Sequence, residues 1–286
     1  MRTLRPERPI DPLTLAILKA VSRVAEQCAI DYFIIGATAR DIILTHVFNL
    51  PTGRATRDVD LAIAVGSWDQ FESLKIALRK SGNFSSSGKL QQRLYFREND
   101  RDFGYPMDLV PFGGVEHGPS MVSWPPDMAV VMDVTGYAEV SEAAEQVQLA
   151  PGFVVRVASL PGLAVLKIFA WLERGSENAK DAHDLLLIMQ TYCDAGNQER
   201  LYNDEFAVIE RLDYDLRLSG AYLLGKHIAH LARDKTYGKL LSILESQTHG
   251  ERLKTQMATC IRHVETPRNA IDQCYASFIA GIRMRP

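Results

Sequence analysis

Two aspartates with one residue between them, Asp58 and Asp60, have the type and spacing that metal-dependent chemistry requires. They begin the segment 58–65, in which apolar residues alternate with smaller or polar ones at the period of a β-strand. Side chains two residues apart on a strand point the same way, about 6–7 Å apart, so both carboxylates face one centre. Two carboxylates this close repel each other, and a hard divalent cation such as Mg²⁺ is the usual relief.

A third carboxylate, Asp108, lies in the apolar stretch 107–111. We expect this stretch to pair with residues 93–97 across the turn-rich segment 98–104, which places Asp108 on an antiparallel strand. Three carboxylates on neighbouring strands suit in-line nucleotidyl transfer, in which two ions about 3.5–4 Å apart activate the attacking oxygen and stabilise the leaving pyrophosphate. We therefore predict two Mg²⁺ ions, or Mn²⁺ in their place, with Asp58 and Asp60 on the nucleotide side and Asp108 on the acceptor side.

A glycine turn upstream of these aspartates is a candidate phosphate site. The short apolar segment 32–35 predicts a strand that runs into Gly36, and residues 37–48 have the pattern of a helix. Backbone N–H groups at a helix N-terminus bind anions, and a glycine lets a ligand approach the backbone closely. The strand, glycine and helix together predict that a nucleotide triphosphate binds at this turn.

The order of these segments resembles that of the DNA polymerase β nucleotidyltransferase superfamily. A pair of aspartates alone is common in turns and edge strands, but here Ile34–Thr38, Arg57–Leu61 and Met107–Leu109 follow one another in the superfamily's order. One branch, the tRNA CCA-adding enzymes, has a Gly-Gly-x-Val-Arg-Asp turn that is similar to Gly36–Asp41. Ala37 replaces the second glycine, and the Arg-Arg-Asp and Glu-x-x-Arg motifs of that branch are missing from the sequence.

The chain resembles the AbiEii/AbiGii-like nucleotidyltransferases over a longer stretch, about residues 32–189. That branch includes toxins of toxin–antitoxin systems classified as type IV. Its later motifs are a lysine on one helix and a Lys-Asp pair that opens the next helix. The corresponding residues here are Lys167 in an apolar segment, then Arg174, and then Lys180 with Asp181.

The resemblance implies a role for each candidate residue. Gly36, Ala37 and Thr38 would approach the nucleotide phosphates, and the three aspartates would bind metal. Lys167 would support the triphosphate, and Asp181 would orient either the nucleotide or Lys167. Ordinary explanations stay open, because Lys167 can be a solvated helix lysine whose amino group snorkels to water and Asp181 can be a helix-capping residue.

Three arginines are further candidates for the nucleotide site. Arg40 and Arg57 can pair with phosphate or with the carboxylates, although an arginine beside an aspartate is often only a surface ion pair. Arg93 can meet the triphosphate or the acceptor, or it can be an exposed strand residue. We include all three among the predicted nucleotide-binding residues.

The elements around these residues predict an α/β half followed by a helical half. Residues 1–158 would form a mixed sheet with flanking helices, as in polymerase β-type nucleotidyltransferases, and residues 159–286 a helical domain that contributes Lys167 and Asp181 to the site. The sequence also predicts helices at 12–27, 67–80, 163–172, 179–189 and over most of 205–282, strands at 130–137 and 153–157, a loop at 82–88 and irregular structure at 113–126.

The composition is that of an ordinary globular protein, with 286 residues, 47% of them hydrophobic and 23% charged. The formal net charge of −3 argues against a general nucleic-acid coat protein, so an RNA acceptor would need a local basic patch. We expect a cytoplasmic protein without a membrane span, because the sequence has no signal-peptide pattern and no run of about 18 apolar residues. Four scattered cysteines without a CxxC pair suggest buried hydrophobic residues rather than disulfides or zinc ligands.

These observations predict a metal-dependent nucleotidyltransferase, an enzyme that moves NMP from an NTP onto a hydroxyl group and releases pyrophosphate. By the resemblance, the acceptor is an RNA end, tRNA in particular, or a protein; the enzyme can be a toxin, and an antitoxin protein can be its partner. A small acceptor such as an aminoglycoside is one alternative. A second is an inactive member that keeps the fold as a binding module, which Ala37 in place of the second glycine supports.

Overall fold

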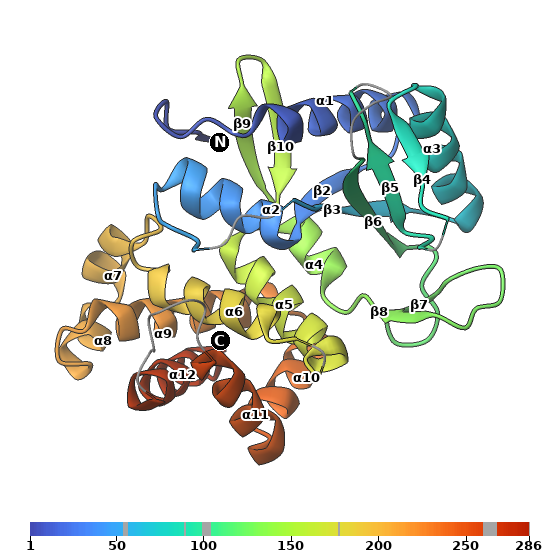
Figure 1. The fold of residues 1–286 in the computed structure, drawn as a ribbon. Helices are drawn as coiled ribbons and strands as arrows, with labels where there is room; N and C mark the ends of the chain where they lie inside the picture. The colour runs from blue at the N-terminus through green and yellow to red at the C-terminus, as the bar shows by residue number, and fades with distance from the viewer. Residues whose placement is uncertain (54–56, 89, 99–103, 177, 260–267, 286) are drawn as a thin grey trace. The chain divides into compact units, whose positions relative to one another are not determined.

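The structure is a computed structural model that describes residues 1–53, 57–88, 90–98, 104–176, 178–259 and 268–285 (Figure 1). The chain separates into two compact units. The first comprises residues 1–49 and 54–158, and the second comprises residues 50–53 and 159–286. Most of the predicted turn at 98–104 lies outside the described residues.

An eight-stranded mixed sheet is the main sheet of the first unit, within the part of the chain that the structure describes (Figure 1). Three neighbouring pairs, β1 with β9, β10 with β2 and β3 with β6, are parallel, and the others are antiparallel. The predicted mixed α/β class is therefore confirmed. The strand order is β1 (Arg2–Thr3), β9 (Glu145–Ala150), β10 (Phe153–Val157), β2 (Tyr32–Ile35), β3 (Val59–Val65), β6 (Tyr105–Gly113), β5 (Arg93–Phe96) and β4 (Phe84–Ser86).

Apolar side chains on both faces of the central strands make the core of this unit. Phe33 and Ile34 on β2, and Leu61 and Ile63 on β3, are fully buried. Because consecutive residues of a strand point to opposite faces, buried neighbours such as Phe33 and Ile34 mean that the sheet is covered on both faces. Asp60 interrupts this apolar pattern near the start of β3.

Two helices of the first unit begin where the sequence offers a capping side chain. Helix α1 (Pro12–Gln27) follows Asp11, whose carboxylate accepts a backbone N–H of the first turn at 2.8 Å. Helix α3 (Trp68–Lys80) follows Ser67, whose hydroxyl accepts a first-turn N–H at 3.2 Å. The structure places both helices where the apolar periodicity predicted them.

The segment after Gly36 is helical, as predicted, but it changes type half-way. Helix α2 (Gly36–Asp41) runs into a π-helix, η1 (Ile42–Val47). The Phe48 N–H donates to the carbonyl oxygen of Ile43, five residues earlier, at 3.1 Å. An apolar pattern over so few residues does not distinguish the α from the π period, so the sequence predicted a single helix.

Short strands account for most differences between prediction and structure in the first unit. The predicted loop 82–88 contains β4, because the ring of Phe84 packs against that of Phe96 on β5 with centroids 5.1 Å apart. The predicted irregular region 113–126 contains β7 (Met121–Ser123). Strands β1 and β9 were not predicted at all.

The predicted strand 130–137 is too long. Strand β8 (Val131–Asp133) pairs with β7 as a separate hairpin that stands apart from the main sheet (Figure 1). Gly136 then takes a left-handed conformation, with φ of 87°, and precedes the short helix α4 (Tyr137–Glu142). This turn ends the extended chain before Tyr137.

Helices supply the regular secondary structure of the second unit, within its described residues. The predicted helix 163–172 corresponds to α5, which is longer at both ends, and the predicted helix 179–189 corresponds to α6, which is shifted by one or two residues. Helix α7 was not predicted. The helices are α5 (Leu160–Arg174), α6 (Lys180–Thr191), α7 (Gln198–Asp204), α8 (Phe206–Arg211), α9 (Leu216–Leu231), α10 (Asp234–Leu244), α11 (Gln247–Ala258) and α12 (Arg268–Ile282).

Two glycines let α9 and α12 pack with their backbones in contact. A Cβ atom on Gly281 would lie 1.9 Å from the carbonyl oxygen of Tyr222, and one on Gly225 would lie 2.1 Å from that of Phe278. Each distance is far below van der Waals contact, so any side chain at these positions would force the helices apart.

Two further properties concern the whole described chain. None of its helices combines the length and the apolar character needed to cross a membrane. Cys28, Cys193 and Cys274 are free thiols, and Cys193 and Cys274 are buried. The fourth cysteine, Cys260, lies outside the described residues.

Candidate active site

The register of the main sheet sets Asp60 and Asp108 side by side. Asp60 on β3 is the direct partner of Asp108 on the parallel strand β6. Ile35 of β2 is the partner of Asp60 on the other side, and Arg93 of β5 is the antiparallel partner of Asp108. These four residues form one row across four strands, and partners in a row point to the same face of a sheet. Asp58, two residues before Asp60 and just outside the strand, shares that side.

Gly36 leaves the space that the Asp60 carboxylate occupies. The residue has a φ of +67°, and a Cβ atom built on it would lie 2.1 Å from Oδ2 of Asp60. Both the conformation and the space therefore require glycine at this turn. The sequence predicted that the glycine admits a phosphate, and the structure adds that it admits the neighbouring carboxylate.

Thr38 ties the same turn to the start of β3. Its side chain is buried, and its hydroxyl donates to the carbonyl oxygen of Asp58 at 2.8 Å. Two segments twenty residues apart in sequence are thus held together beside the aspartates. The hydroxyl already has an acceptor, so the geometry gives Thr38 a positioning role, and its predicted contact with phosphate stays a prediction. Ala37, before it, is buried as well.

Arg93 holds both carboxylate oxygens of Asp108. Nε of Arg93 donates to Oδ1 and Nη2 donates to Oδ2, each at 2.7 Å. Nη2 also lies 3.7 Å from Oδ2 of Asp58. The hydrogen bonds that Arg93 donates to Asp108 and the negative charges of Asp108 and Asp58 favour the charged guanidinium more than burial disfavours it, so the pKa of Arg93 lies above its usual value. A single guanidinium therefore bridges two of the three aspartates.

The donor chemistry of Asp58, Asp60 and Asp108 fits a magnesium ion, because Mg²⁺ prefers carboxylate oxygens and completes its shell with water and phosphate. The side chains as they stand do not form a ready ligand set. Among the described residues, no three His, Cys, Asp or Glu side chains are grouped so as to hold a metal ion. At Asp108 the guanidinium of Arg93 already binds both carboxylate oxygens, and its positive charge opposes a metal ion there.

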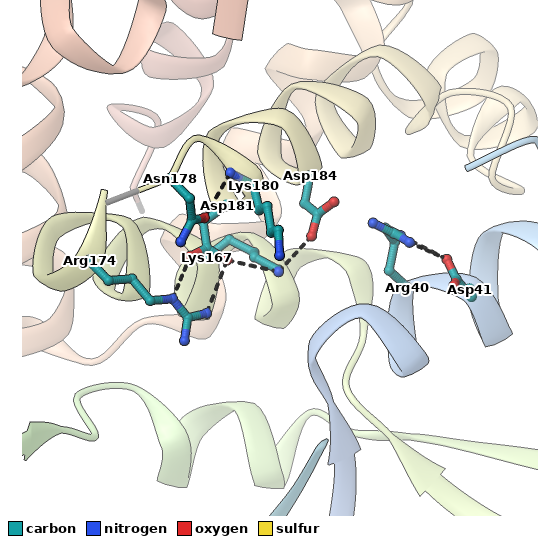
Figure 2. Close-up of polar contacts among 8 residues, drawn as sticks. All are labelled: Arg40, Asp41, Lys167, Arg174, Asn178, Lys180, Asp181 and Asp184. Atoms are coloured by element: carbon teal, nitrogen blue, oxygen red, sulfur yellow. Dashed lines mark hydrogen bonds and ion pairs between the residues drawn. The ribbon is translucent and has the colours of Figure 1, made fainter. Parts of the chain in front are cut away.

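A second polar cluster is built entirely within the second unit, between α5 and α6 (Figure 2). Nζ of Lys167 lies 2.9 Å from Oδ1 of Asp181 and 2.6 Å from Oδ2 of Asp184. Nε of Arg174 donates to Oδ2 of Asp181 at 2.8 Å. Lys167 and Arg174 are seven residues apart, and Asp181 and Asp184 are three apart, so each pair shares one helix face.

The charges of this cluster compensate one another in a buried place. Burial alone would lower the pKa of Lys167, but Asp184 and Asp181 outweigh it and raise the pKa. Burial alone would raise the pKa of Asp181, but Lys167 and Arg174 lower it to about 2. Lys167 is thus a buried, ion-paired lysine and not a solvated one. Asp184, to which the sequence gave no role, is its second carboxylate, and the spacing three residues after Asp181 was the available signal.

The remaining two arginines differ in their surroundings. Arg40 on α2 is 1% exposed, and its Nε and Nη2 atoms donate to Oδ1 of Asp41 at 2.8 and 2.6 Å (Figure 2). Arg57 is exposed and directly precedes Asp58. Of the two roles left open for these arginines, Arg40 shows pairing with a carboxylate, although the partner is Asp41. For Arg57, binding to phosphate stays a prediction.

Comparison with known proteins gives one match of sequence and several of structure. The family model described as "Nucleotidyl transferase AbiEii toxin, Type IV TA system" matches residues 17–277. No protein with a curated description matches the chain.

The similar solved structures share little sequence with the chain. An antigenic nucleotidyltransferase-like protein from Paracoccidioides brasiliensis is 15% identical, with 71% of this chain and 93% of that chain covered and a TM-score of 0.43. ANT(2'')-Ia in complex with adenylyl-2''-tobramycin is 15% identical, with 70% and 99% covered and a TM-score of 0.39. The Thermotoga maritima CCA-adding enzyme complexed with tRNA is 11% identical, with 97% and 82% covered and a TM-score of 0.27. All three TM-scores are below 0.5, so these structures support no conclusion about the chain. Its family is identified by the family model alone.

Proposed function

The chain belongs to the family of AbiEii nucleotidyl transferases, and from this membership we propose that it is a metal-dependent enzyme that transfers NMP from an NTP to a hydroxyl group. The acceptor oxygen forms a bond to the α-phosphorus while the bond from that phosphorus to the β-phosphate oxygen breaks. Pyrophosphate leaves, and the hydroxyl proton passes to solvent. The products are a phosphodiester and pyrophosphate.

We assign metal binding to Asp58, Asp60 and Asp108. The observation that carries the proposal is the register of the sheet, which pairs Asp60 directly with Asp108 on adjacent parallel strands. Divalent ions bound to these carboxylates would activate the acceptor hydroxyl and stabilise the leaving pyrophosphate. The chain's own contribution is to hold three acids on one side of the sheet, with the Gly36 turn beside them.

We assign nucleotide binding to the residues around this turn and to the second unit. Gly36, Ala37 and Thr38 would approach the phosphates, since backbone N–H groups that open a helix attract anions. The positively charged candidates would compensate the triphosphate: Arg40, Arg57, Arg93 and Lys167. Asp181 would keep Lys167 in place, which its 2.9 Å contact supports. In this proposal the helical domain, residues 159–286, contributes Lys167 and Asp181.

For the biological role we propose a toxin that modifies an RNA end, tRNA in particular, or a protein hydroxyl. The family description names a toxin of a type IV toxin–antitoxin system, so an antitoxin protein is the expected partner. NTPs and RNA are cytoplasmic substrates, which supports action in the cytoplasm. A small acceptor such as an aminoglycoside would be the alternative within the same chemistry.

The test is a transfer assay with each of the four α-³²P-labelled NTPs and Mg²⁺ or Mn²⁺. Total RNA, the protein itself and a set of aminoglycosides are supplied as separate acceptors. We expect label on one acceptor class with the natural chain and with Asp69→Asn, a control at an exposed helix aspartate, and none with Asp58→Asn/Asp60→Asn.

Absence of transfer to every acceptor, together with no thermal stabilisation by Mg²⁺ and NTP, would contradict the proposal. That result would favour the inactive binding module. Ala37 in place of the second glycine and the engagement of Asp108 by Arg93 are the features consistent with such a module.

A further inference from the structure

Arg93 lies beside two of the three candidate metal-binding aspartates, Asp58 and Asp108. It is the cross-strand partner of Asp108, it binds both oxygens of that carboxylate at 2.7 Å, and its Nη2 lies 3.7 Å from Asp58. The side chains of Arg93 and Asp108 are 22% and 17% exposed, so water screens this pair only partly. Bidentate, charge-assisted pairs of this kind are among the strong hydrogen bonds of proteins.

The charges show what the guanidinium does in the free protein. Asp58 and Asp108 together carry −2, and Arg93 brings this pair to −1 (−2 + 1). Without Arg93, these two carboxylates would lose the cation that lies beside both of them. Arg93 is therefore an internal counter-ion that stabilises Asp58 and Asp108 before any metal binds.

The same contact opposes metal binding. A metal ion that binds an oxygen of Asp108 must share the carboxylate with Arg93, and the two positive charges repel each other. The repulsion favours a guanidinium that turns to another anion. A nucleotide triphosphate supplies one, because the planar fork of an arginine binds phosphate oxygens in pairs just as it binds a carboxylate.

We propose that Arg93 is a positioning residue that exchanges Asp108 for the triphosphate of the incoming nucleotide, and that this exchange makes metal and nucleotide bind cooperatively. The inference rests on the proposed function and adds an order of events to it. Metal alone binds weakly, since it competes with Arg93. Nucleotide releases Asp108, and each ligand strengthens the other by the same factor, as linkage requires.

The test measures binding rather than turnover. The Kd for Mg²⁺ is determined by calorimetry with and without each α,β-methylene NTP, whose bridging carbon prevents transfer. The chains compared are the natural one, Arg93→Met, Arg93→Lys and a control, Arg97→Met. Arg97 follows the same strand and is exposed, so its loss removes a charge without touching Asp108.

For the natural chain and Arg97→Met we expect the analogue to tighten Mg²⁺ binding by about tenfold or more. In Arg93→Met, Mg²⁺ alone should bind about tenfold more tightly than in the natural chain, and the analogue should tighten Mg²⁺ binding by a smaller factor than in the natural chain. Arg93→Lys should lie between, because an ammonium keeps the charge and loses the fork. Circular dichroism establishes that each variant is folded.

Two results overturn the inference in distinguishable ways. If the natural chain shows cooperative binding and Arg93→Met keeps both the weak Mg²⁺ affinity and the full cooperativity, only the role of Arg93 is wrong. If the natural chain binds neither Mg²⁺ nor the analogue, or if Asp60→Asn binds both unchanged, the proposed function fails along with it. Should Arg93→Met not fold, Asp108→Asn tests the same contact, because it frees Arg93 and should tighten analogue binding in the absence of metal.

Discussion

The carboxylate of Asp60 lies so close to the backbone of Gly36 that a Cβ atom on residue 36 would be 2.1 Å from Oδ2 of Asp60. Ile35, just before the glycine, is the cross-strand partner of Asp60. The turn and the acid are therefore fixed against each other by the sheet itself. A larger side chain at residue 36 must therefore displace the carboxylate of Asp60.

Gly36→Ala should destabilise the protein and displace Asp60. Its φ of +67° costs an alanine about 1 kcal/mol, and the contact with Asp60 should add about 1–3 kcal/mol. Gly82→Ala is the matched control, because Gly82 also has a positive φ, +94°, but no atom lies within 4 Å of its added Cβ. Urea unfolding of both variants measures the difference. Equal losses would show that the Asp60 contact has no energetic consequence.

Lys167→Met should be strongly destabilising, by about 3–5 kcal/mol, because it leaves the buried carboxylates of Asp181 and Asp184 without their shared cation. Adding Asp184→Asn should restore part of the loss by removing one uncompensated charge. The exposed Lys80→Met serves as control and should change the free energy of unfolding by less than about 0.5 kcal/mol. A loss for Lys167→Met no larger than the control's would mean that the ion pairs contribute nothing.

The half-buried His227 should make the free energy of unfolding depend on pH. Burial, with smaller contributions from Arg200, His230 and Lys226, lowers its pKa to about 4. Arg200 Nη1 lies 3.1 Å from Nε2 of His227, and since arginine only donates, that nitrogen must accept and stay unprotonated. Nδ1, 2.5 Å from the hydroxyl oxygen of Tyr192, then carries the proton.

The protein should become less stable as the pH falls, because His227 binds a proton less readily in the folded chain than in the unfolded chain. Below about pH 6.5 an unfolded histidine takes up a proton, whereas folded His227 does so only near pH 4, so its contribution is complete above 6.5 and is lost as the pH falls towards 4. We expect the free energy of unfolding to drop by about 1 kcal/mol between pH 7.5 and 5, allowing for partial exposure. His227→Gln should remove this drop, and the exposed His117→Gln should keep it. The reverse pattern would assign the pH dependence to other histidines.

Several strands of the main sheet could be predicted from the sequence, because their signal lies within the strand itself. The apolar alternation of residues 59–65 and the apolar run 32–35 each predict a strand without reference to any partner, and β3 and β2 lie there. Strand β1 has only Arg2 and Thr3, whose extended form depends on pairing with β9, almost 150 residues away. Such a contact leaves no periodic signal in the sequence.

Part of the candidate site could likewise be predicted from the sequence, and part depends on contacts between distant segments. The sequence shows directly that Asp58 and Asp60 are two residues apart and that Asp108 lies in a later apolar segment. The structure adds the strand register, which pairs Asp60 with Asp108. The pairing of Arg93 with Asp108 depends on that register to the single residue, because a shift by one would turn Arg93 to the opposite face. Similarly, Lys167 among apolar residues allows burial or snorkelling, and only the approach of α6 with its two aspartates decides between them.

Thr38→Val should separate positioning from stability. Valine fills the buried space of threonine but loses the hydrogen bond to the Asp58 carbonyl oxygen, which should cost about 1 kcal/mol. Thr191→Val is matched to it, since Thr191 also donates its hydroxyl to a backbone carbonyl, that of Leu187, at 2.7 Å. Thr191 is half-buried and its bond lies within one helix, so Thr191→Val should lose less stability than Thr38→Val. Because only Thr38 holds the segment that carries Asp58, we expect nucleotidyl transfer to fall by about tenfold or more in Thr38→Val alone. Equal activities in the two variants would show that the Thr38 contact supports the fold and does not position Asp58.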